Sequence, residues 1–356
     1  MVETVQDLRF CHSADGTAIA YAVHGSGPPL LIDACWLSHL QFDWQSPVWR
    51  HFLVELGRVA TVIRFDERGH GLSDREVTDF SLARRIEDLE AVADHAGLDR
   101  FALMAMAQGG PISIEYAVRH PERLTRLVFY GSDAGMTPNG SAEATALNDA
   151  FEALIKVGWE RPTPEFRRVF TTMLIPDATE EQMGWLDELQ RQAVTAETAI
   201  LSRRERLRAD ARHLLPELDL PVLVVHSRGE RMKTFDEARY LASHVRGARL
   251  VALESRNHIV LEHEAAWPEF LREVCDFLVA DRAPGSPGAD VSTLLSPREL
   301  DVLGLAAEGA DNDAIAARLH LSLRTVERHL QNVYAKLGLH GRNARAAAVA
   351  RLLTRA

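Results

Sequence analysis

Cysteine is scarce in this sequence, which has three among 356 residues, at positions 11, 35 and 275. An odd number of widely separated cysteines excludes a disulfide framework and indicates a reducing compartment. Long apolar runs are also missing, because stretches such as Leu220–Val225 are far shorter than the ~18–20 residues of a membrane helix. The first residues include acids and no apolar core, which excludes a signal peptide. We therefore expect a cytoplasmic protein with no membrane association.

The composition is ordinary for a folded soluble chain, with 46% hydrophobic and 26% charged residues, which excludes a disordered or fibrous protein. Because single cores stop growing at about 250–300 residues, the length predicts one large and one small unit. The net charge of −11 is unevenly spread, since residues 290–356 carry nine Lys and Arg against seven Asp and Glu. A basic end on an acidic body is typical of a phosphate-facing module, although a solvated basic helix face gives the same pattern.

Residues 281–292 are rich in Pro, Gly and Ser, which predicts a linker between domains of residues 1–280 and 293–356. In the first domain, β-like runs alternate with helical patterns, as in an α/β protein with a mostly parallel sheet. Strands are expected at Leu30–Asp33, Val59–Phe65, Phe101–Ala105, Leu124–Tyr130, Val222–His226 and Leu250–Leu253. Helices are expected at Ser81–His95, Pro111–His120, Asp236–Val245 and Ala266–Val279. Leu8–His12 and Ala18–His24 predict an antiparallel hairpin, and residues 132–215 predict an inserted helical cap.

The segment after the linker predicts four helices. The first begins with a capping box at Leu295-Ser-Pro-Arg-Glu and ends at Gly309. The second is expected at about 312–319 and the fourth at 343–353. The third is capped by Ser322, and its apolar residues follow one helical stripe, namely Val326, Leu330, Val333 and Leu337.

This segment closely resembles the LuxR-type helix-turn-helix domain. The resemblance is carried over some sixty residues by Leu295-Ser-Pro-Arg-Glu, Gly309, Ile315-Ala316, Leu319, Ser322, Thr325-Val326, His329, Asn332, Tyr334 and Lys336-Leu337-Gly338. It implies an all-α domain of four helices that binds a double-stranded DNA operator. The fourth helix of this family commonly forms a dimer contact, which implies a homodimer on two half-sites. Its Ala-rich run would permit close approach, and packing onto the first helix remains the alternative.

Base edges in the major groove are read by side chains on the outer face of one helix. In the third helix, Glu327, Arg328 and Gln331 are the candidates for base contacts. Phosphate contacts position a helix without reading sequence, and we assign them to Arg324, Thr325, Asn332 and Lys336.

In the first domain, Phe65-Asp-Glu-Arg-Gly-His-Gly-Leu-Ser-Asp74 follows a strand with the pattern D-x-R-G-x-G-x-S. Pro121-Glu-Arg123 precedes another strand. Together with the region 101–130, these motifs resemble the α/β-hydrolase fold over about residues 5–280, more weakly in the cap. The fold class expected is an α/β-hydrolase fold with an inserted helical cap, plus the helix-turn-helix domain.

The reaction centre departs from that family. Its nucleophile stands in a strand–turn–helix elbow, G-x-S-x-G, which here reads Ala105-Met-Ala-Gln-Gly109 with Ala107 at the nucleophile position. A methyl group cannot attack a carbonyl, so acyl transfer of the family type is expected to be absent. The other triad positions correspond to Glu230 and His258. His258 could be a residual buried histidine, a hydrogen-bond partner of a ligand, or a general base.

The oxyanion side is altered as well. Asp33-Ala34-Cys35-Trp36 stands where hydrolases usually have His-Gly. Asp33 either faces the pocket, where its carboxylate would oppose a developing oxyanion, or points away and braces the loop. Cys35 and Ser113 are the remaining nucleophiles nearby, and neither stands at an elbow.

A binding site is nevertheless expected. Backbone N–H groups of Gln108 and Gly109, at a helix N-terminus, could hold a carbonyl or carboxylate oxygen. The candidate ligand-binding residues are Ala107, Gln108, His258, Trp36, Asp33, Trp159, Met173 and Trp185. No metal site and no cofactor are expected.

These features together predict a DNA-binding transcription regulator. Its hydrolase-like domain would bind a small, partly apolar signal molecule instead of acting as an enzyme. One alternative is an enzyme that uses the Glu230–His258 dyad without a nucleophile, of the cofactor-free oxygenase or lyase type. The other is a ligand-free scaffold that recruits a partner.

Overall fold

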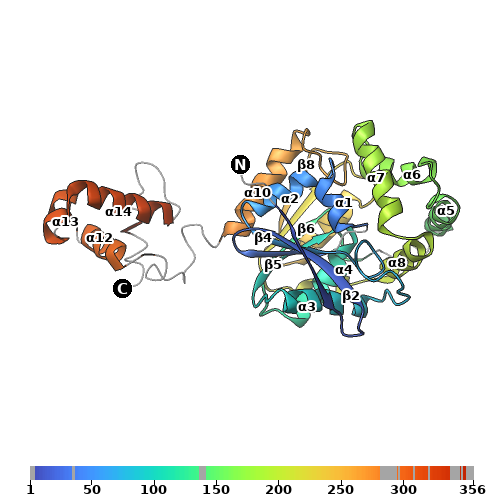
Figure 1. The fold of residues 1–356 in the computed structure, drawn as a ribbon, viewed down its shortest axis with the longest axis horizontal. Helices are drawn as coiled ribbons and strands as arrows, with labels where there is room; N and C mark the ends of the chain where they lie inside the picture. Colours follow the sequence, from blue (N-terminus) through green and yellow to red (C-terminus); the bar gives the residue numbers. More distant parts are fainter. Residues whose placement is uncertain are drawn as a thin grey trace. The chain divides into compact units, whose positions relative to one another are not determined.

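A computed structural model describes residues 5–33, 37–135, 142–280, 295, 297–307, 309–319, 321–336, 345, 348 and 349. The chain forms two compact units, Met1–Leu278 and Val279–Ala356. Figure 1 shows the first as a central sheet between layers of helices and the second as a small group of helices. The expected linker, residues 281–292, lies outside the described residues.

The sheet of the first unit has eight strands in the order β1-β2-β4-β3-β5-β6-β7-β8. Their bounds are β1 Asp7–His12, β2 Ala18–Gly25, β3 Pro29–Ile32, β4 Thr61–Phe65, β5 Phe101–Met106, β6 Leu124–Tyr130, β7 Val222–Ser227 and β8 Arg249–Leu253. β1 pairs antiparallel with β2, and β2 with β4, whereas the remaining neighbours are parallel. The predicted hairpin and the mostly parallel sheet are therefore confirmed.

The central strands are apolar on both faces because helices cover both. In β5, Ala102, Met104 and Met106 join one buried cluster, and the alternate residues Phe101, Leu103 and Ala105 join the other. The first cluster includes residues of α2 (Arg50–Gly57) and α10 (Ala266–Val279). The second includes residues of α3 (Leu82–His95), α4 (Gly110–Arg119) and α9 (Phe235–His244).

The four helices expected outside the cap are present as α3, α4, α9 and α10. Sequence analysis missed α2 and the short α1 (Leu40–Gln45). Six and eight residues span about two turns, too few for a clear apolar periodicity.

The segment between β6 and β7 is a helical cap, as expected. Its elements are α5 Ala142–Gly158, α6 Glu165–Leu174, α7 Glu180–Ala193, α8 Ala196–Arg208 and the 3-10 helix η2 Arg212–Glu217. Thr179 and Thr195 cap α7 and α8 by accepting backbone N–H bonds at the third helical position. Trp159 and Phe170 lie in the buried core of the cap and contact each other edge to face, with ring centroids 5.6 Å apart.

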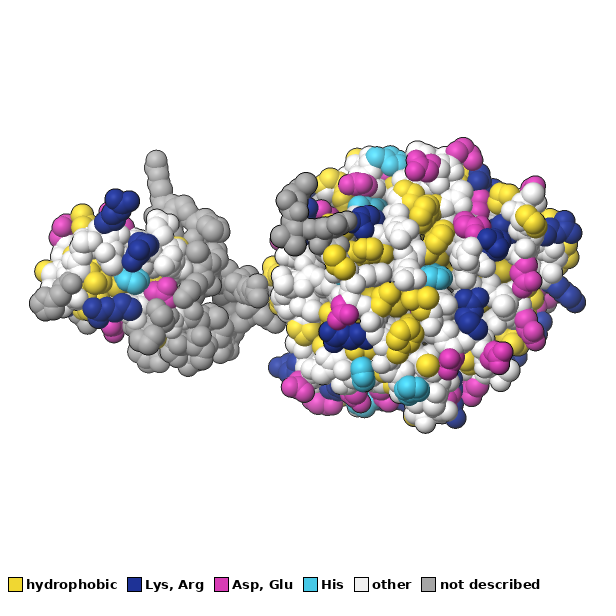
Figure 2. All heavy atoms as spheres, viewed as in Figure 1, with side chains coloured by type: hydrophobic (Ala, Val, Ile, Leu, Met, Phe, Trp, Pro, Cys, Tyr) yellow, Lys and Arg dark blue, Asp and Glu magenta, His cyan; other side chains and the backbone are white. Residues whose placement is uncertain are grey.

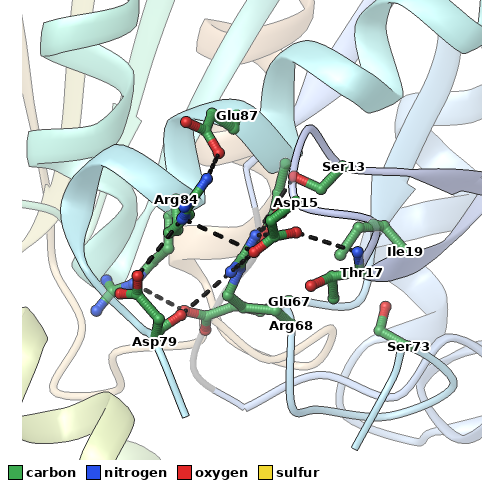
Figure 3. Close-up of polar contacts among 12 residues, drawn as sticks. Ser13, Asp15, Thr17, Ile19, Glu67, Arg68, Ser73, Asp79, Arg84 and Glu87 are labelled. Atoms are coloured by element: carbon green, nitrogen blue, oxygen red, sulfur yellow. Dashed lines mark hydrogen bonds and ion pairs between the residues drawn. The ribbon is translucent and has the colours of Figure 1, made fainter. Parts of the chain in front are cut away.

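The loop after β4 is held by Arg68, whose side chain is fully buried. Its guanidinium donates two bonds of 2.7 Å to the carboxylate of Asp88 on α3. A further bond of 2.9 Å reaches Asp15, in the turn between β1 and β2 (Figure 3). This paired, bidentate arrangement compensates the burial of the charge and ties three segments together.

In the second unit, α12 (Pro297–Ala307), α13 (Asn312–Leu319) and α14 (Leu323–Lys336) enclose a small core. The core includes Val302, Ala306, Ile315, Val326 and Leu330. The fourth expected helix lies outside the described residues apart from Arg345, Ala348 and Val349. Of the helices described in either unit, none has the length and apolar character needed to cross a bilayer.

A pH dependence of stability follows from His70, in the loop after β4. The residue is fully buried, and burial lowers the pKa of its imidazole to about 4. Below the ordinary pKa of about 6.5, the unfolded chain binds a proton that the folded unit does not bind. The free energy of unfolding should therefore decrease as the pH is lowered from 6.5 to 4. His70 should contribute about 1.4 kcal/mol of this decrease per pH unit.

The measurement is urea unfolding of the full chain at several pH values, followed by Trp fluorescence. All six Trp lie between residues 36 and 267, so the signal reports the first unit. His70→Gln should flatten the pH dependence, whereas a change at exposed His263, His263→Gln, should leave it unchanged. Equal slopes for wild type and His70→Gln would contradict the assignment.

Candidate functional site

The elbow predicted from the sequence forms with an alanine at its apex. β5 leads through a 3-10 turn, Ala107–Gly109, directly into α4. Ala107 has a φ of 47°, the one positive φ found among the described non-glycine residues. A left-handed backbone at a residue with a Cβ is strained by about 1–2 kcal/mol.

Crowded backbone around the turn explains its small residues. A Cβ built on Gly110 would lie 1.7 Å from the carbonyl oxygen of Asp133, in the loop after β6. A Cβ on Gly109 would lie 2.7 Å from a carboxylate oxygen of Asp33, which follows β3. The ends of three strands therefore meet at one turn, which tolerates no larger side chain at these two positions.

Glu230 and His258 form a buried pair beside the elbow. The Nδ1 atom of His258 lies 2.9 Å from Oε2 of Glu230, and Oε1 of Glu230 accepts a 2.7 Å bond from the backbone N–H of Lys233. A carboxylate is an acceptor only, so Nδ1 carries the proton and Nε2 is left as the basic nitrogen. The backbone N–H of His258 also donates to the carbonyl oxygen of Leu174 in the cap, at 2.7 Å.

Asp33 is 1% exposed, and its carboxylate faces α4, where it accepts a 3.0 Å bond from the hydroxyl of Ser113. This contact joins the end of β3 to α4 and corresponds to the bracing alternative. Ser113 is fully buried and engaged in this bond, so it is not presented as a nucleophile. Cys35 lies outside the described residues.

A cavity of about 170 Å³ lies between the cap and the ends of the strands, and we call it the cap cavity. The elbow side contributes Gln108, Pro111 and Asp133, and the loop after β7 contributes Arg231, Met232 and Lys233. The cap contributes the remaining lining residues, Leu147, Asn148, Phe151, Phe170, Met173, Arg203, Arg206 and Leu207. The site is thus part apolar and part cationic.

The structure brings only some of the predicted ligand-binding residues together. Gln108 and Met173 line the cap cavity. His258 lines a separate apolar cavity of about 20 Å³, and Asp33 lines another of about 40 Å³. Ala107 is 3% exposed and lines none of these three cavities.

The predicted tryptophans lie elsewhere. Trp159 is 1% exposed, and its indole N–H donates to the carbonyl oxygen of Val194, so it belongs to the interior of the cap. Trp185 packs against Phe42 of α1 with the two rings tilted by 31° and their centroids 4.5 Å apart. Trp36 lies outside the described residues.

Sequence analysis missed the basic residues of the cap cavity, Arg203, Arg206, Arg231 and Lys233. In α8, the first two share a helical face with Ala199, which is fully buried. The sequence signal that could have identified them is the presence of two arginines on the face of α8 that otherwise carries small residues. The partners of these arginines come from other elements, so spacing within α8 does not reveal them.

The third helix of the second unit, α14, separates its side chains as predicted. Val326, Leu330 and Val333 are buried, whereas Arg324, Glu327, Arg328, Gln331 and Asn332 are exposed. Thr325 is partly buried, and its backbone N–H donates to the hydroxyl of Ser322 at 3.2 Å. Lys336 ends the helix, and its side chain lies outside the description. Figure 2 shows several basic side chains on the visible face of this unit.

No cluster of three or more His, Cys, Asp or Glu side chains suited to a metal ion occurs within the described ranges. Cys11 and Cys275 are free thiols, and burial raises the pKa of each to about 11. At neutral pH both are thiols rather than reactive thiolates.

Comparison with known families divides the chain in the same way. Residues 293–349 match the family described as bacterial regulatory proteins, luxR family. Residues 31–170 match the family described as alpha/beta hydrolase fold.

Individual relatives include proteins named as hydrolases. A pimeloyl-[acyl-carrier protein] methyl ester esterase of Neisseria meningitidis is 31% identical over 196 residues, which is 52% of this chain and 75% of the relative. The serine hydrolase BPHL of Mus musculus is 24% identical over 61% of this chain and 69% of its own length. Among solved structures, an esterase from Rhodococcus sp. ECU1013 superposes with a TM-score of 0.63 at 22% identity, covering 77% of this chain and 98% of the esterase.

The strained turn gives a direct prediction. Ala107→Gly should raise the free energy of unfolding by about 1 kcal/mol, because glycine adopts a positive φ without strain. Urea unfolding of the full chain measures this, with Ala105→Gly in the adjoining strand as the control that should destabilise. A loss of stability in Ala107→Gly would contradict the strain.

Proposed function

Because the chain belongs to the α/β-hydrolase fold family and ends in a domain of the luxR family of bacterial regulatory proteins, we propose that a small molecule controls its DNA binding. In this proposal the hydrolase-like unit is the receptor and the second unit is the DNA reader. The observation that carries it is the pairing of an intact DNA-binding helix with an elbow that lacks a nucleophile.

The DNA-reading part rests on α14. One side of this helix is buried in the unit, and the other presents Arg328 and Gln331 to solvent, with Glu327 beside them. Arginine pairs with guanine and glutamine with adenine in the major groove, where one helix fits. Arg324, Thr325, Asn332 and Lys336 would contact the phosphates that flank the bases. A homodimer would place two such helices on two half-sites.

The receptor part rests on the elbow and the cap cavity. Ala107 has no group that can form an acyl intermediate, so the Glu230–His258 pair has no nucleophile to activate. The cap cavity combines aromatic and aliphatic walls with a few polar groups, as ligand sites generally do. Binding there shifts the protein toward whichever conformation holds the ligand more tightly, and this difference in affinity sets the strength of control.

The intact Glu230–His258 pair favours a second candidate, an enzyme that uses His258 as a general base without a nucleophile. In such an enzyme His258 would have to reach the substrate. In the structure it lines a cavity of only about 20 Å³ under the cap, which favours the receptor. A scaffold that recruits a partner through a filled pocket is less favoured, because the cap cavity is open.

A test of DNA reading begins with duplexes selected from a random library by the full wild-type chain. Arg328→Ala should weaken binding to the selected sites at least tenfold and broaden the sequence preference, because one bidentate base contact contributes about 1–3 kcal/mol. Lys336→Ala should lower the affinity for selected and unselected DNA alike. It should also reduce the slope of log affinity against log salt concentration by about one, because one phosphate contact is removed.

The control is Arg246→Ala, which removes the same charge from the exposed surface of the first unit. It should leave both affinities unchanged. If Arg328→Ala bound the selected sites as tightly as the wild type, the assignment of α14 as the reading helix would be wrong.

A test of the missing nucleophile uses p-nitrophenyl butyrate. Wild type and His258→Ala should hydrolyse it at the same rate as buffer, because no side chain at the elbow can be acylated. Turnover by the wild type that disappears in His258→Ala would establish the enzyme instead. Ala107→Ser is the third variant. If it hydrolysed the ester, the missing hydroxyl at position 107 would be the reason that the wild type does not.

A further inference from the structure

The charges around the cap cavity are unequally matched. Its lining includes four cationic side chains, Arg203, Arg206, Arg231 and Lys233, and one carboxylate, Asp133. A site with this balance favours an anion, provided that the cations are not already neutralised by partners inside the protein.

Two of the four cations are neutralised. The ammonium of Lys233 forms an ion pair with Asp133. The guanidinium of Arg206 forms an ion pair with Glu67, which also lies 3.1 Å from Arg85. Because Asp133 is engaged with Lys233, the lining holds no carboxylate for the remaining two cations.

Arg203 differs from them. Its Nη2 atom donates a 2.8 Å bond to the neutral amide oxygen of Asn148, and its guanidinium stands over the ring of Phe151, 5.3 Å from the centroid. Its Nη1 atom is buried and has no hydrogen-bond partner in the described part of the chain. The nearby carboxylate of Glu152 is occupied by Arg204, through bonds of 2.9 and 2.6 Å.

In the described part of the chain Arg203 has no ion pair of its own, because the Glu152 carboxylate that attracts it is hydrogen-bonded to Arg204, and a partly buried cation requires such a partner. Burial accordingly lowers the pKa of Arg203. Arg231, exposed at the same cavity, adds a second cation that a ligand can reach from solvent. A carboxylate matches the fork of an arginine and can accept two parallel N–H bonds.

The remaining lining residues indicate the chemical character of the part of the ligand that lies away from Arg203. Phe151, Phe170 and Met173 form an apolar wall next to Arg203, and Leu147 and Leu207 extend it. A volume of about 170 Å³ is close to that of an apolar cavity of roughly 150 Å³ that accommodates benzene.

We infer that the cap cavity binds a small organic anion, a carboxylate attached to an apolar group of benzene size, with Arg203 and Arg231 on the carboxylate. This inference rests on the proposed receptor function and specifies the class of its ligand. The apolar group lies against Phe151, Phe170 and Met173, and the anion supplies the missing partner of Arg203.

The experiment uses the full chain with benzoate, phenylacetate and 3-phenylpropanoate, and with the primary amide of each acid as the uncharged counterpart. Isothermal titration calorimetry measures affinity, and thermal unfolding measures the shift on binding. At least one carboxylate should bind, ten times or more tightly than its amide. Arg203→Gln should lower the affinity for that carboxylate at least tenfold and leave the affinity for its amide unchanged.

Arg208→Gln is the matched control, because Arg208 lies on the same helix, is exposed and pairs with Glu205. It should leave the affinity for the carboxylate unchanged. Arg203→Met separates binding from folding. Removing a cation without a counter-ion should leave the unfolding midpoint of the free protein the same or about 2–4 °C higher.

Three results would overturn the inference. These are binding of none of the carboxylates, equal affinity for an acid and its amide, and an unchanged carboxylate affinity in Arg203→Gln. Equal affinities would leave the receptor function standing with an uncharged ligand. If none of the carboxylates or amides bound, the inference about the ligand would fail. DNA reading is tested separately by Arg328→Ala, so failure of the ligand proposal can be distinguished from failure of the DNA-binding proposal.

Discussion

Backbone crowding at the turn between β5 and α4 controls the geometry of the site. The turn brings Ala107 into the left-handed region, places Gly110 against the carbonyl of Asp133, and places Gly109 against the carboxylate of Asp33. Contacts this close fix the ends of β3, β5 and β6 relative to one another. The first residues of α4 consequently face the cap whether or not a nucleophile is present. The architecture of the elbow is therefore present with an alanine at its apex.

The carboxyl ends of parallel strands meet at one edge of a sheet, which is where ligands bind in folds of this type. Here the same edge gathers Gln108 after β5, Asp133 after β6 and Lys233 after β7. The cap closes over this edge and contributes Arg203 and the aromatic wall. Two pairs of titratable groups at this edge are matched within the protein, Glu230 with His258 and Lys233 with Asp133. In contrast to these pairs, the Nη1 atom of Arg203 has no hydrogen-bond partner among the described residues, which supports the proposed external anion.

The two units differ in what holds them together. The first has two large apolar clusters, one on each face of the sheet, and a buried charge network around Arg68. The second depends on a few residues of α12, α13 and α14, so that nearly all of the outer face of α14 remains exposed. Such a division suits the proposed receptor joined to a reader, because the apolar core around the cap cavity belongs to one unit and the exposed face of α14 to the other.

Local pattern alone determined the alternation of strands and helices, the buried stripe of α14 and the absence of a hydroxyl at the elbow. Each of these is expressed within a few neighbouring residues, as a period of two or 3.6 or as one side chain in a short motif. The two short helices α1 and α2 escaped prediction because they span too few turns to show a period.

Tertiary structure decided which residues share a cavity. It placed Gln108 and Met173 together, moved His258 to a separate cavity and buried Trp159 in the cap. It also decided that Arg206 pairs with Glu67 whereas Arg203 contacts the amide of Asn148 and the ring of Phe151. Those outcomes depend on contacts between different elements, for example 35 residues apart for Trp159 and Val194 and 55 for Arg203 and Asn148. They arise from the packing of the cap helices against one another and over the sheet. The sequence carries no local period for such contacts, so the charges that line the cap cavity could be identified only from the folded chain.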